Sequence, residues 1–327
     1  MMEPERGTNR RVFCRTIAGV TAAGIAGLKP WDPAMACTRV LWNTNGLAVI
    51  AGRTMDWPEF TQPVLTVFPR GLKRNGGRAG PQTVVQTNPA RWQSRHGSLV
   101  TTCYGIGSVD GVKEHGLAGH LLYLNATDFG TRDIGKPGLH AGLWLQYALD
   151  NARTVTEALA ILDNVQIVMV EAHGHKATVH LAMEDATGDS AILEHIDGKV
   201  VVHHGREYRV MTNDPPYDQQ LALLKQMSER NDFANPSSNT PLPGNVSPTD
   251  RFQRAAYYQR VLPEPKKQRE AVASMFAIMA NVSVPFLTRS NTPSGTGPAI
   301  EALCCMLLPW KGCSAAETRR DRLTNRH

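Results

Sequence analysis

The sequence predicts a single α+β domain, a sandwich of sheets and helices, on three observations. Candidate strands and candidate helices alternate in blocks along the chain, an order that suits an α+β sandwich better than a doubly wound parallel sheet. The 327 residues contain no internal repeat and no clear linker. About 290 residues remain behind a candidate leader, which is enough for one large core, and the hydrophobic fraction of 42% is ordinary for a globular protein.

The first element is a candidate export leader, residues 1–36. Residues 9–15, Asn-Arg-Arg-Val-Phe-Cys-Arg, are typical of a twin-arginine signal. Residues 16–28 form a weakly apolar run of secretory length, too short for a membrane span of about 20 residues. The Ala-x-Ala pattern of a cleavage site then precedes Cys37, which predicts a periplasmic or secreted protein. A lipoprotein signal also places a cysteine after the cut, but it usually has leucine where this chain has Ala34.

The first half of the remaining chain predicts strands followed by helices. Two short strands, residues 39–42 and 47–54, flank an Asn-Thr-Asn-Gly turn. A glycine-rich basic loop is expected at residues 69–81. Further strands are expected at residues 64–68, 99–104 and 116–124, and helices at residues 139–151 and 155–162. Thr154 and Glu157 match a capping box at the start of the second helix.

The second half follows the same alternation. Strands are expected at residues 178–183, 190–195, 199–203 and 208–212, and helices at residues 217–230, 250–261 and 269–280. Residues 231–248 are polar and proline-rich, which predicts a long loop of the kind that often borders a binding site. No segment outside the leader resembles a membrane span, so no membrane partner is expected.

The net charge of +6 suggests a nucleic-acid partner until its distribution is considered. Residues 1–36 carry +2 and residues 311–327 carry +3, which leaves +1 for the body of the chain. A nearly neutral body has no electrostatic footprint for a phosphate backbone, so no nucleic-acid partner is expected.

Six cysteines divide by position. Cys14 would leave with the leader, and Cys103 ends an apolar stretch, which predicts a buried thiol. Cys304, Cys305 and Cys313 lie near the end of the sequence, where no regular disulfide framework is visible.

The remaining cysteine, Cys37, would begin the mature chain. A cysteine at a free amino terminus combines a nucleophilic thiol with an α-amine whose ordinary pKa of roughly 7.7–8.0 suits a general base. The cleavage pattern therefore predicts an N-terminal-nucleophile amide hydrolase.

Five motifs, in this order, resemble the choloylglycine hydrolase family, which includes bile salt hydrolases and penicillin V acylases. The motifs are Cys-Thr-Arg at 37–39, Gly-Arg-Thr-Met-Asp-Trp at 52–57, Asp-Gly-Val-Lys-Glu-His-Gly-Leu at 110–117, Met-Thr-Asn-Asp-Pro at 211–215 and Ser-Pro-Thr-Asp-Arg-Phe at 247–252. They extend the resemblance from residue 37 to about residue 290, and it is strongest toward the penicillin V acylases of Gram-negative bacteria.

The resemblance implies a four-layer αββα Ntn-hydrolase sandwich of antiparallel sheets over residues 37–327. It implies cleavage of a linear amide through an acyl-enzyme, with no metal and no cofactor, on a small-molecule amide substrate. It also implies a possible homotetramer.

The resemblance further implies a role for each matching residue. Cys37 would be nucleophile and, through its amine, general base. Arg53 would favour the thiolate, and Asp56 would hold the α-ammonium. Asn213 would donate its amide to the developing oxyanion, an interaction worth about 3–4 kcal/mol in the transition state. Arg251 would complete the charge network.

Tyr123 and Trp57 concern the substrate. The resemblance implies that Tyr123 contributes to the oxyanion site, at a position that is usually Asn in bile salt hydrolases and Tyr in penicillin V acylases. Trp57 would line the acyl pocket, because an aromatic wall suits a phenoxyacetyl group or an acyl chain. Penicillin V and N-acyl homoserine lactones are therefore favoured over conjugated bile salts, although all three remain open.

Each of these residues also has an ordinary interpretation. Arg53 and Asp56 could form a surface ion pair worth about 0–1 kcal/mol, Asn213 could lie in a simple turn, and Tyr123 could be a core residue. Their combination with Cys37 favours a site.

Six histidines between residues 173 and 204 raise the question of a metal site: His173, His175, His180, His195, His203 and His204. Their spacing fits no zinc pattern, because they lie on separate predicted strands. No metal is expected.

Residues 296–327 form a divergent tail. The family continues with a Trp-containing strand and an aromatic-rich hairpin, whereas residues 314–327 show no strand alternation. A reading-frame change or genuine divergence would produce this pattern, and missing core strands would leave an open sheet edge. The alternative hypothesis is a vestigial secreted binding protein that has a pocket and no turnover.

Overall fold

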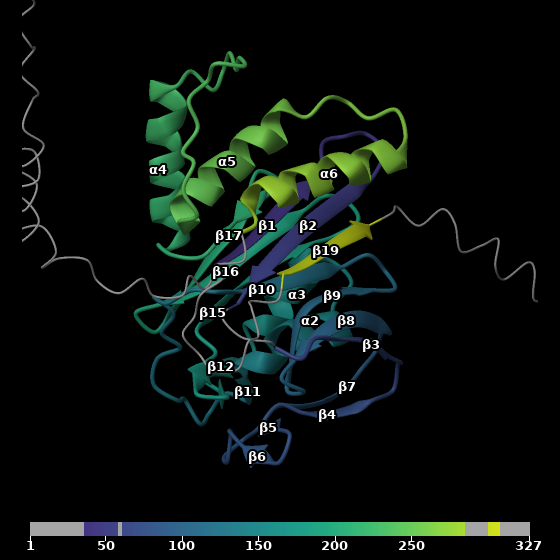
Figure 1. Cartoon of the computed structure of the whole chain (residues 1–327). Coiled ribbons are helices and arrows are strands. Elements are labelled where there is room, and N and C mark those ends of the chain that lie inside the picture. The colour runs from purple at the N-terminus through teal and green to yellow at the C-terminus, as the bar shows by residue number, and fades with distance from the viewer. Residues whose placement is uncertain (1–35, 58–60, 285–299, 308–327) are drawn as a thin grey trace, which may run out of the picture. The chain divides into compact units, whose positions relative to one another are not determined.

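Two antiparallel sheets form the centre of the fold in a computed structural model that describes residues 36–57, 61–284 and 300–307 (Figure 1). The predicted leader apart from Ala36, and the predicted tail apart from residues 300–307, lie outside the described residues. The first sheet has the order β18-β1-β2-β19. Its strands are β1 (Ala36–Trp42), β2 (Val49–Asp56), β18 (Val210–Met211) and β19 (Ile300–Leu307).

The second sheet has seven strands in the order β17-β16-β15-β10-β9-β8-β3. Its strands are β3 (Val64–Phe68), β8 (Ser98–Cys103), β9 (Gly107–Lys113), β10 (Ala118–Tyr123), β15 (Val179–Glu184), β16 (Ser190–Ile196) and β17 (Lys199–His204). Neighbouring strands in both sheets are antiparallel.

A layer of helices covers the outer face of each sheet (Figure 1). Helices α5 (Pro248–Val261) and α6 (Gln268–Val282) pack on β1 and β2, and α4 (Tyr217–Arg230) packs on α5. Helix α2 (Trp144–Asn151) packs on β9, next to α3 (Val155–Leu162). The predicted four-layer αββα sandwich of antiparallel sheets is therefore confirmed.

Short elements complete the described chain. Three are antiparallel pairs: β4 (Lys73–Asn75) with β7 (Arg91–Gln93), β5 (Arg78–Ala79) with β6 (Gln82–Thr83), and β13 (Glu171–Ala172) with β14 (His175–Lys176). The others are the parallel pair of β11 (Gly138–His140) with β12 (Gln166–Val168) and the 3₁₀ turn η1 (Ala141–Leu143). Among the described helices, none is both long and apolar enough to cross a membrane.

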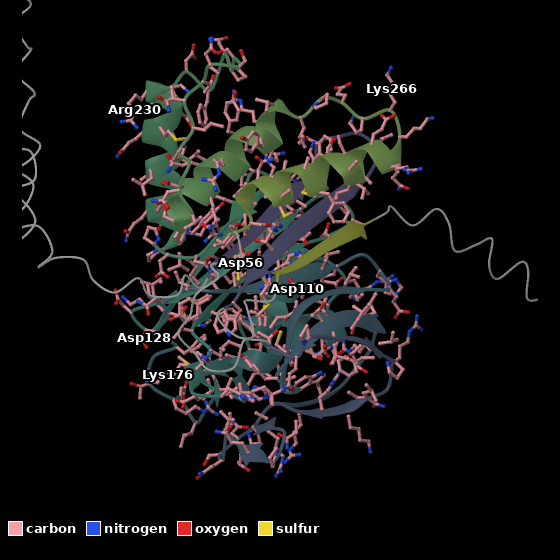
Figure 2. All side chains as sticks on the ribbon, viewed as in Figure 1. Asp56, Asp110, Asp128, Lys176, Arg230 and Lys266 are labelled. Carbon is pink, nitrogen blue, oxygen red and sulfur yellow. The ribbon has the colours of Figure 1, made fainter. Side chains whose placement is uncertain are left out.

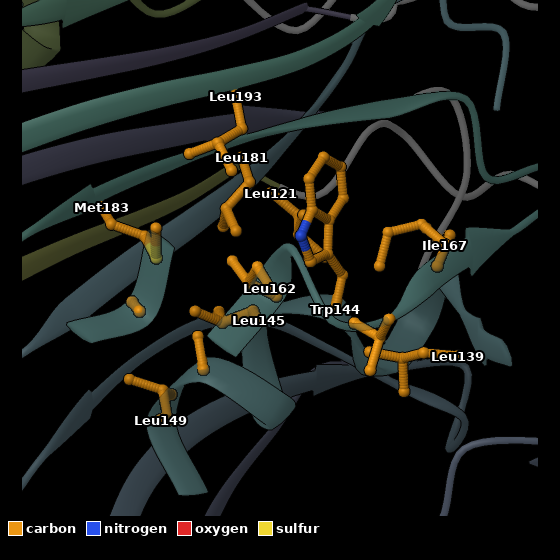
Figure 3. Packing of buried hydrophobic residues seen from close by; sticks show 14 of the residues in the cluster. Leu121, Leu139, Trp144, Leu145, Leu149, Leu162, Ile167, Leu181, Met183 and Leu193 are labelled. Atoms are coloured by element: carbon orange, nitrogen blue, oxygen red, sulfur yellow. The ribbon is translucent and has the colours of Figure 1, made fainter. Parts of the chain in front are cut away.

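A pair of glycines lets α2 lie close to the second sheet. Gly111 of β9 and Gly119 of β10 are register partners. A Cβ atom at Gly119 would lie 2.7 Å from Leu145 Cδ1, and one at Gly111 would lie 2.9 Å from Leu149 Cδ1. Both leucines belong to the buried cluster around Trp144 that joins α2 to the sheet (Figure 3). Because side chains would hold the helix away, this core depends on the two glycines.

Several predicted elements are matched to the residue, namely β3, α3 and α4. The side-chain cap of α3 is confirmed, since Thr154 Oγ1 accepts a hydrogen bond from the Glu157 amide at 3.2 Å. Glu157 Oε2 accepts from the Arg153 amide at 2.7 Å, one residue before the position that a capping box uses.

Three local predictions were wrong. The helix expected from residue 139 begins at Trp144, because residues 138–140 pair in parallel with β12. The loop expected at residues 69–81 contains β4 and β5. Strand β9 was not expected, since Gly, Asp and Lys have low strand propensity and only pairing on both sides makes this segment extended.

Candidate active site

The pairing of β1 with β2 brings the predicted nucleophile to its neighbours. Cys37 lies opposite Met55, two residues from the pair Arg39–Arg53. The Cys37 side chain is buried, and its Sγ lies 3.6 Å from Nη2 of Arg53. The Cys37 nitrogen donates a hydrogen bond of 2.7 Å to Asn213 Oδ1. Asn213, which lies 176 positions further along the chain, therefore contacts Cys37 directly.

Arg53 is fixed by groups of the second sheet. Its Nη1 donates to the Asp110 carboxylate, and its Nη2 donates to the Leu121 carbonyl oxygen at 3.0 Å. Burial opposes its charged form, but Asp110 and the Cys37 sulfur outweigh burial and raise the pKa of Arg53 above its ordinary value. The guanidinium beside the sulfur therefore remains a cation, which stabilises a thiolate.

Arg251, on α5, joins the helical layer to β1. Its Nη1 donates to the Cys37 carbonyl oxygen and, at 2.6 Å, to Thr38 Oγ1, while its Nη2 donates to Asn213 Oδ1 at 2.9 Å. Burial lowers the pKa of Arg251 to about 10, a value that still leaves it charged at neutral pH.

The side chain of Asn213 is oriented by three hydrogen bonds. Its Oδ1 accepts from Cys37 and Arg251, and its Nδ2 donates to the Tyr123 carbonyl oxygen at 2.7 Å. The oxygen, rather than the amide nitrogen, therefore faces Cys37 in this structure. The role of Nδ2 as an oxyanion donor stays a prediction.

Asp56 ends β2 as a buried carboxylate. Its Oδ1 accepts from the Val284 amide at 3.3 Å, and its Oδ2 is buried with no hydrogen-bond partner in this part of the structure. The register places it opposite Ala36. Burial raises the pKa of Asp56 to about 6, partly offset by Arg251. Arg53 and Asp56 are both buried, which rules out the surface-pair interpretation.

Replacing Asp56 by Asn is expected to stabilise the chain in which the Cys37 nitrogen is still a peptide amide, and to weaken the site once that nitrogen is a free amine. Because the folded-state pKa of about 6 exceeds the ordinary 3.8, the free energy of unfolding falls as the pH rises from about 4 to about 6. Asp56→Asn removes this loss, worth up to about 3 kcal/mol at pH 7.5. The activity should fall about 100-fold through lost positioning. Urea unfolding at pH 4 and 7.5 checks the stability, and equal differences at the two pH values would contradict it.

An apolar cavity of about 110 Å³ opens beside Cys37. It is lined by residues of both sheets and of the β13–β14 hairpin, including Met55, Trp57, Cys103, Tyr104, Leu121, Tyr123, Val170, His175 and Val179. Trp57 Nε1 donates to the Tyr104 hydroxyl at 2.7 Å, and its ring meets those of Tyr123 and His175 edge-on at 5.9 and 5.5 Å. The predicted aromatic residues Trp57 and Tyr123 thus both line the cavity together with Cys37.

The structure brings together all seven predicted site residues and adds others. Asp56 and Asp110 lie in the middle of the molecule, between the helical layers (Figure 2). Asp110 belongs to a motif that the sequence analysis recognised without giving it a role. Tyr104 and His175 were missed, because the turn after β8 and the short strand β14 that carry them belong to no motif. Cys103 is buried, as predicted.

Histidines with possible metal-ligand geometry occur in one cluster of the described residues. The ligand atoms of His96, Glu114 and His115 lie within 4.8 Å of one another. However, Arg70 donates to both Glu114 oxygens at 2.7 Å. Burial, together with the positive charge of Lys113, lowers the pKa of His96 to about 4. The cationic surroundings therefore disfavour a metal ion at this cluster. None of the six histidines between residues 173 and 204 belongs to it.

Comparison with known proteins agrees with this geometry. The family model for linear amide C–N hydrolases of the choloylglycine hydrolase family matches residues 37–297. A penicillin V acylase of Pectobacterium atrosepticum is 37% identical over 277 residues, 77% of this chain and 70% of that protein. A bile salt hydrolase/transferase of Bifidobacterium longum is 25% identical over 284 residues, 76% of this chain and 81% of that protein.

A solved structure shows the same fold. The penicillin V acylase from Agrobacterium tumefaciens superposes with a TM-score of 0.67 at 38% identity, over 80% of this chain and 77% of that one. The family match begins at Cys37, the residue on which the geometry of the site converges. The chain is therefore a member of the choloylglycine hydrolase family of linear amide C–N hydrolases, as its motifs predicted.

Proposed function

We propose that this protein is an exported hydrolase that cleaves a linear amide through an acyl-enzyme on Cys37. One observation carries the proposal: the buried Cys37 sulfur lies at an apolar cavity, 3.6 Å from a buried guanidinium. Removal of the leader before Cys37 would convert its nitrogen from a peptide amide into an amine.

The reaction then has two halves. The Cys37 thiolate attacks the amide carbon, the C–N bond breaks, and the leaving nitrogen takes a proton from the α-ammonium. An acyl thioester remains. The α-amine next takes a proton from a water molecule, whose oxygen attacks the thioester; the C–S bond breaks, the acid is released, and the Cys37 thiolate and α-ammonium are restored. Arg53 stabilises the thiolate that starts each cycle.

Two neighbouring side chains are suited to hold the amine. Asn213 Oδ1 already accepts a hydrogen bond from the Cys37 nitrogen. Asp56 Oδ2, buried and without a partner among the described residues, would gain one in an α-ammonium. An unpartnered buried carboxylate oxygen is costly, so a cation there would be strongly favoured. The support for cleavage before Cys37 is therefore electrostatic as well as a sequence pattern.

The cavity supports an acyl group with an aromatic or extended apolar end. Its walls include Trp57, Tyr104 and Tyr123, which present ring faces and edges to a ligand. Two similar proteins, at 37 and 38% identity, are penicillin V acylases, whereas the bile salt hydrolase/transferase is 25% identical. We therefore favour penicillin V, then N-acyl homoserine lactones, over conjugated bile salts.

Mass spectrometry of the exported protein tests the proposal. The expected mature chain starts at Cys37 with a free amine. Brief exposure to penicillin V should add one phenoxyacetyl group to Cys37, and acid quenching should preserve this adduct for measurement. A retained leader, or a lipid on Cys37, would contradict the mechanism. A vestigial binding protein, suggested by a family match that stops at residue 297, would bind penicillin V without forming the adduct.

A further inference from the structure

Buried charges continue behind Arg53 into the second sheet. The guanidinium that faces Cys37 also donates to Asp110 on β9, through Asp110 Oδ2. The other carboxylate oxygen, Oδ1, lies 2.7 Å from Nδ1 of His120 on β10. The side chains of Arg53, Asp110 and His120 are at most 2% exposed. The nucleophile is thus connected to a buried histidine through two side chains.

The chain of contacts ends on a second ion pair. His120 Nε2 lies 2.8 Å from Glu184 Oε1 on β15, and Glu184 Oε2 accepts a hydrogen bond from Arg39 on β1. Arg39 also donates to Ser190 Oγ and to the Tyr208 carbonyl oxygen, each at 3.1 Å. Arg39 and Glu184 are fully buried. His120 therefore bridges two salt bridges that link the sheets.

Hydrogen bonding fixes the protonation of His120. A neutral imidazole has one donor and one acceptor nitrogen, whereas an ionised carboxylate only accepts. Both ring nitrogens face carboxylate oxygens, so both must donate and the ring must be an imidazolium. Burial acts to lower the pKa of His120, but Glu184 and Asp110 outweigh it and the pKa is raised. Burial acts to raise the pKa of Glu184, but Arg39 and His120 bring it down to about 2.

The charges of this cluster do not cancel without the nucleophile. Three cations, Arg39, Arg53 and His120, face two carboxylates, Asp110 from β9 and Glu184 from β15. One positive charge is left over in a place shielded from water, where uncompensated charge is costly. A thiolate on the cysteine beside Arg53 offsets this charge, while Arg251, which also lies beside Cys37, has Asp56 as its own acidic neighbour.

We infer that His120 is a positioning residue for the nucleophile: as a lasting imidazolium it holds Asp110 against Arg53 and supplies the charge that the Cys37 thiolate neutralises. The inference deepens the proposed function and rests on Cys37 being its nucleophile. His120 bonds to Asp110 and Glu184 and acts on the sulfur only through Asp110 and Arg53. Without it, Asp110 Oδ1 would lose the partner that orients the carboxylate.

Alkylation of Cys37 tests the inference without any need for turnover. The rate of reaction with iodoacetamide is measured from pH 5 to 10, with peptide mass spectrometry to count Cys37 apart from Cys103. His120→Gln is expected to raise the pH of half-maximal alkylation by about one unit, which slows the reaction about tenfold on the acid side. Adding Glu184→Gln removes one negative charge, and the double variant should return most of the way to wild type.

The matched control is His195→Gln. His195 is buried on β16 in the same sheet, packs on Phe129 and Trp144, and bonds to no carboxylate in this part of the structure. It should leave the pH profile unchanged. The inference is overturned if His120→Gln leaves the pH profile of alkylation unchanged. It is also overturned if the double variant or the His195→Gln control displaces that profile as far as His120→Gln does.

A second measurement does not need the single variant, in case His120→Gln alone is too unstable to purify. In ¹⁵N-histidine NMR spectra at pH 8, wild-type protein should show a ring with both nitrogens protonated that is missing from His120→Gln/Glu184→Gln. If no doubly protonated ring is lost in the double variant, His120 is neutral and the inference fails. Neither result depends on whether penicillin V is hydrolysed, so a failure here is distinct from a failure of the proposed hydrolase.

Discussion

Cys37→Ala is expected to lower kcat/KM for the amide substrate by about 10⁴-fold or more, because removal of a covalent nucleophile leaves only binding and oxyanion stabilisation. The fold should survive, since alanine suits a buried apolar position where the sulfur accepts a hydrogen bond of 3.6 Å from Arg53. Release of 6-aminopenicillanic acid from penicillin V, followed by a primary-amine assay, measures the loss. Cys37→Ser should bind penicillin V with little turnover.

The matched control for this prediction is Cys103→Ala, which removes the other buried thiol of the same cavity. The acyl adduct on Cys37 should still form in Cys103→Ala and be absent from Cys37→Ala. Hydrolysis at the full rate by Cys37→Ala would show that another group is the nucleophile.

Arg53→Met should lower the free energy of unfolding by about 1–3 kcal/mol, the usual cost of taking a partner away from a buried polar group. Asp110 would retain its contact with His120 and lose the hydrogen bond from Arg53 that ties β9 to β2. Activity should fall as well, because the thiolate loses its neighbouring guanidinium. Urea unfolding at pH 7.5, together with the penicillin V assay, measures both effects.

The chain offers a control with the same substitution at an exposed pair. Arg70 donates to Glu114 with two hydrogen bonds of 2.7 Å, yet its side chain is 63% exposed. Arg70→Met should therefore cost only about 0–1 kcal/mol. If the two variants lose similar stability, burial does not set the strength of the Arg53–Asp110 pair, and the prediction fails.

The proximity of the candidate site residues could be predicted from the sequence where those residues belong to short consecutive motifs. Cys37, Arg53 and Asp56 lie on two adjacent strands joined by a recognisable Asn-Gly turn, and Trp57 directly follows the second strand, so their proximity follows from a hairpin. Asn213 and Arg251 were found only through motifs. They lie 38 positions apart in the sequence, and no local pattern indicates that their side chains form a hydrogen bond.

The partners of those residues were harder to predict. Asp110 reaches Arg53 across 57 positions, and Glu184 reaches Arg39 across 145. Such pairs depend on how two sheets face each other, which propensity and periodicity do not encode. Strand β9 was missed for the same reason: its residues favour a turn in isolation, and only β8 and β10 on either side keep it extended.

The pairing of β19 with β2 has a consequence for the order in which the protein can mature. Strand β2 carries Arg53 and Asp56, and its eight residues pair one-to-one with β19, from Ile300 opposite Asp56 to Leu307 opposite Val49. On the ribosome, β2 is an exposed sheet edge until that late segment emerges. A nascent chain therefore carries β2 with one edge unpaired for most of its synthesis, a period in which chaperones or other strands can bind that edge.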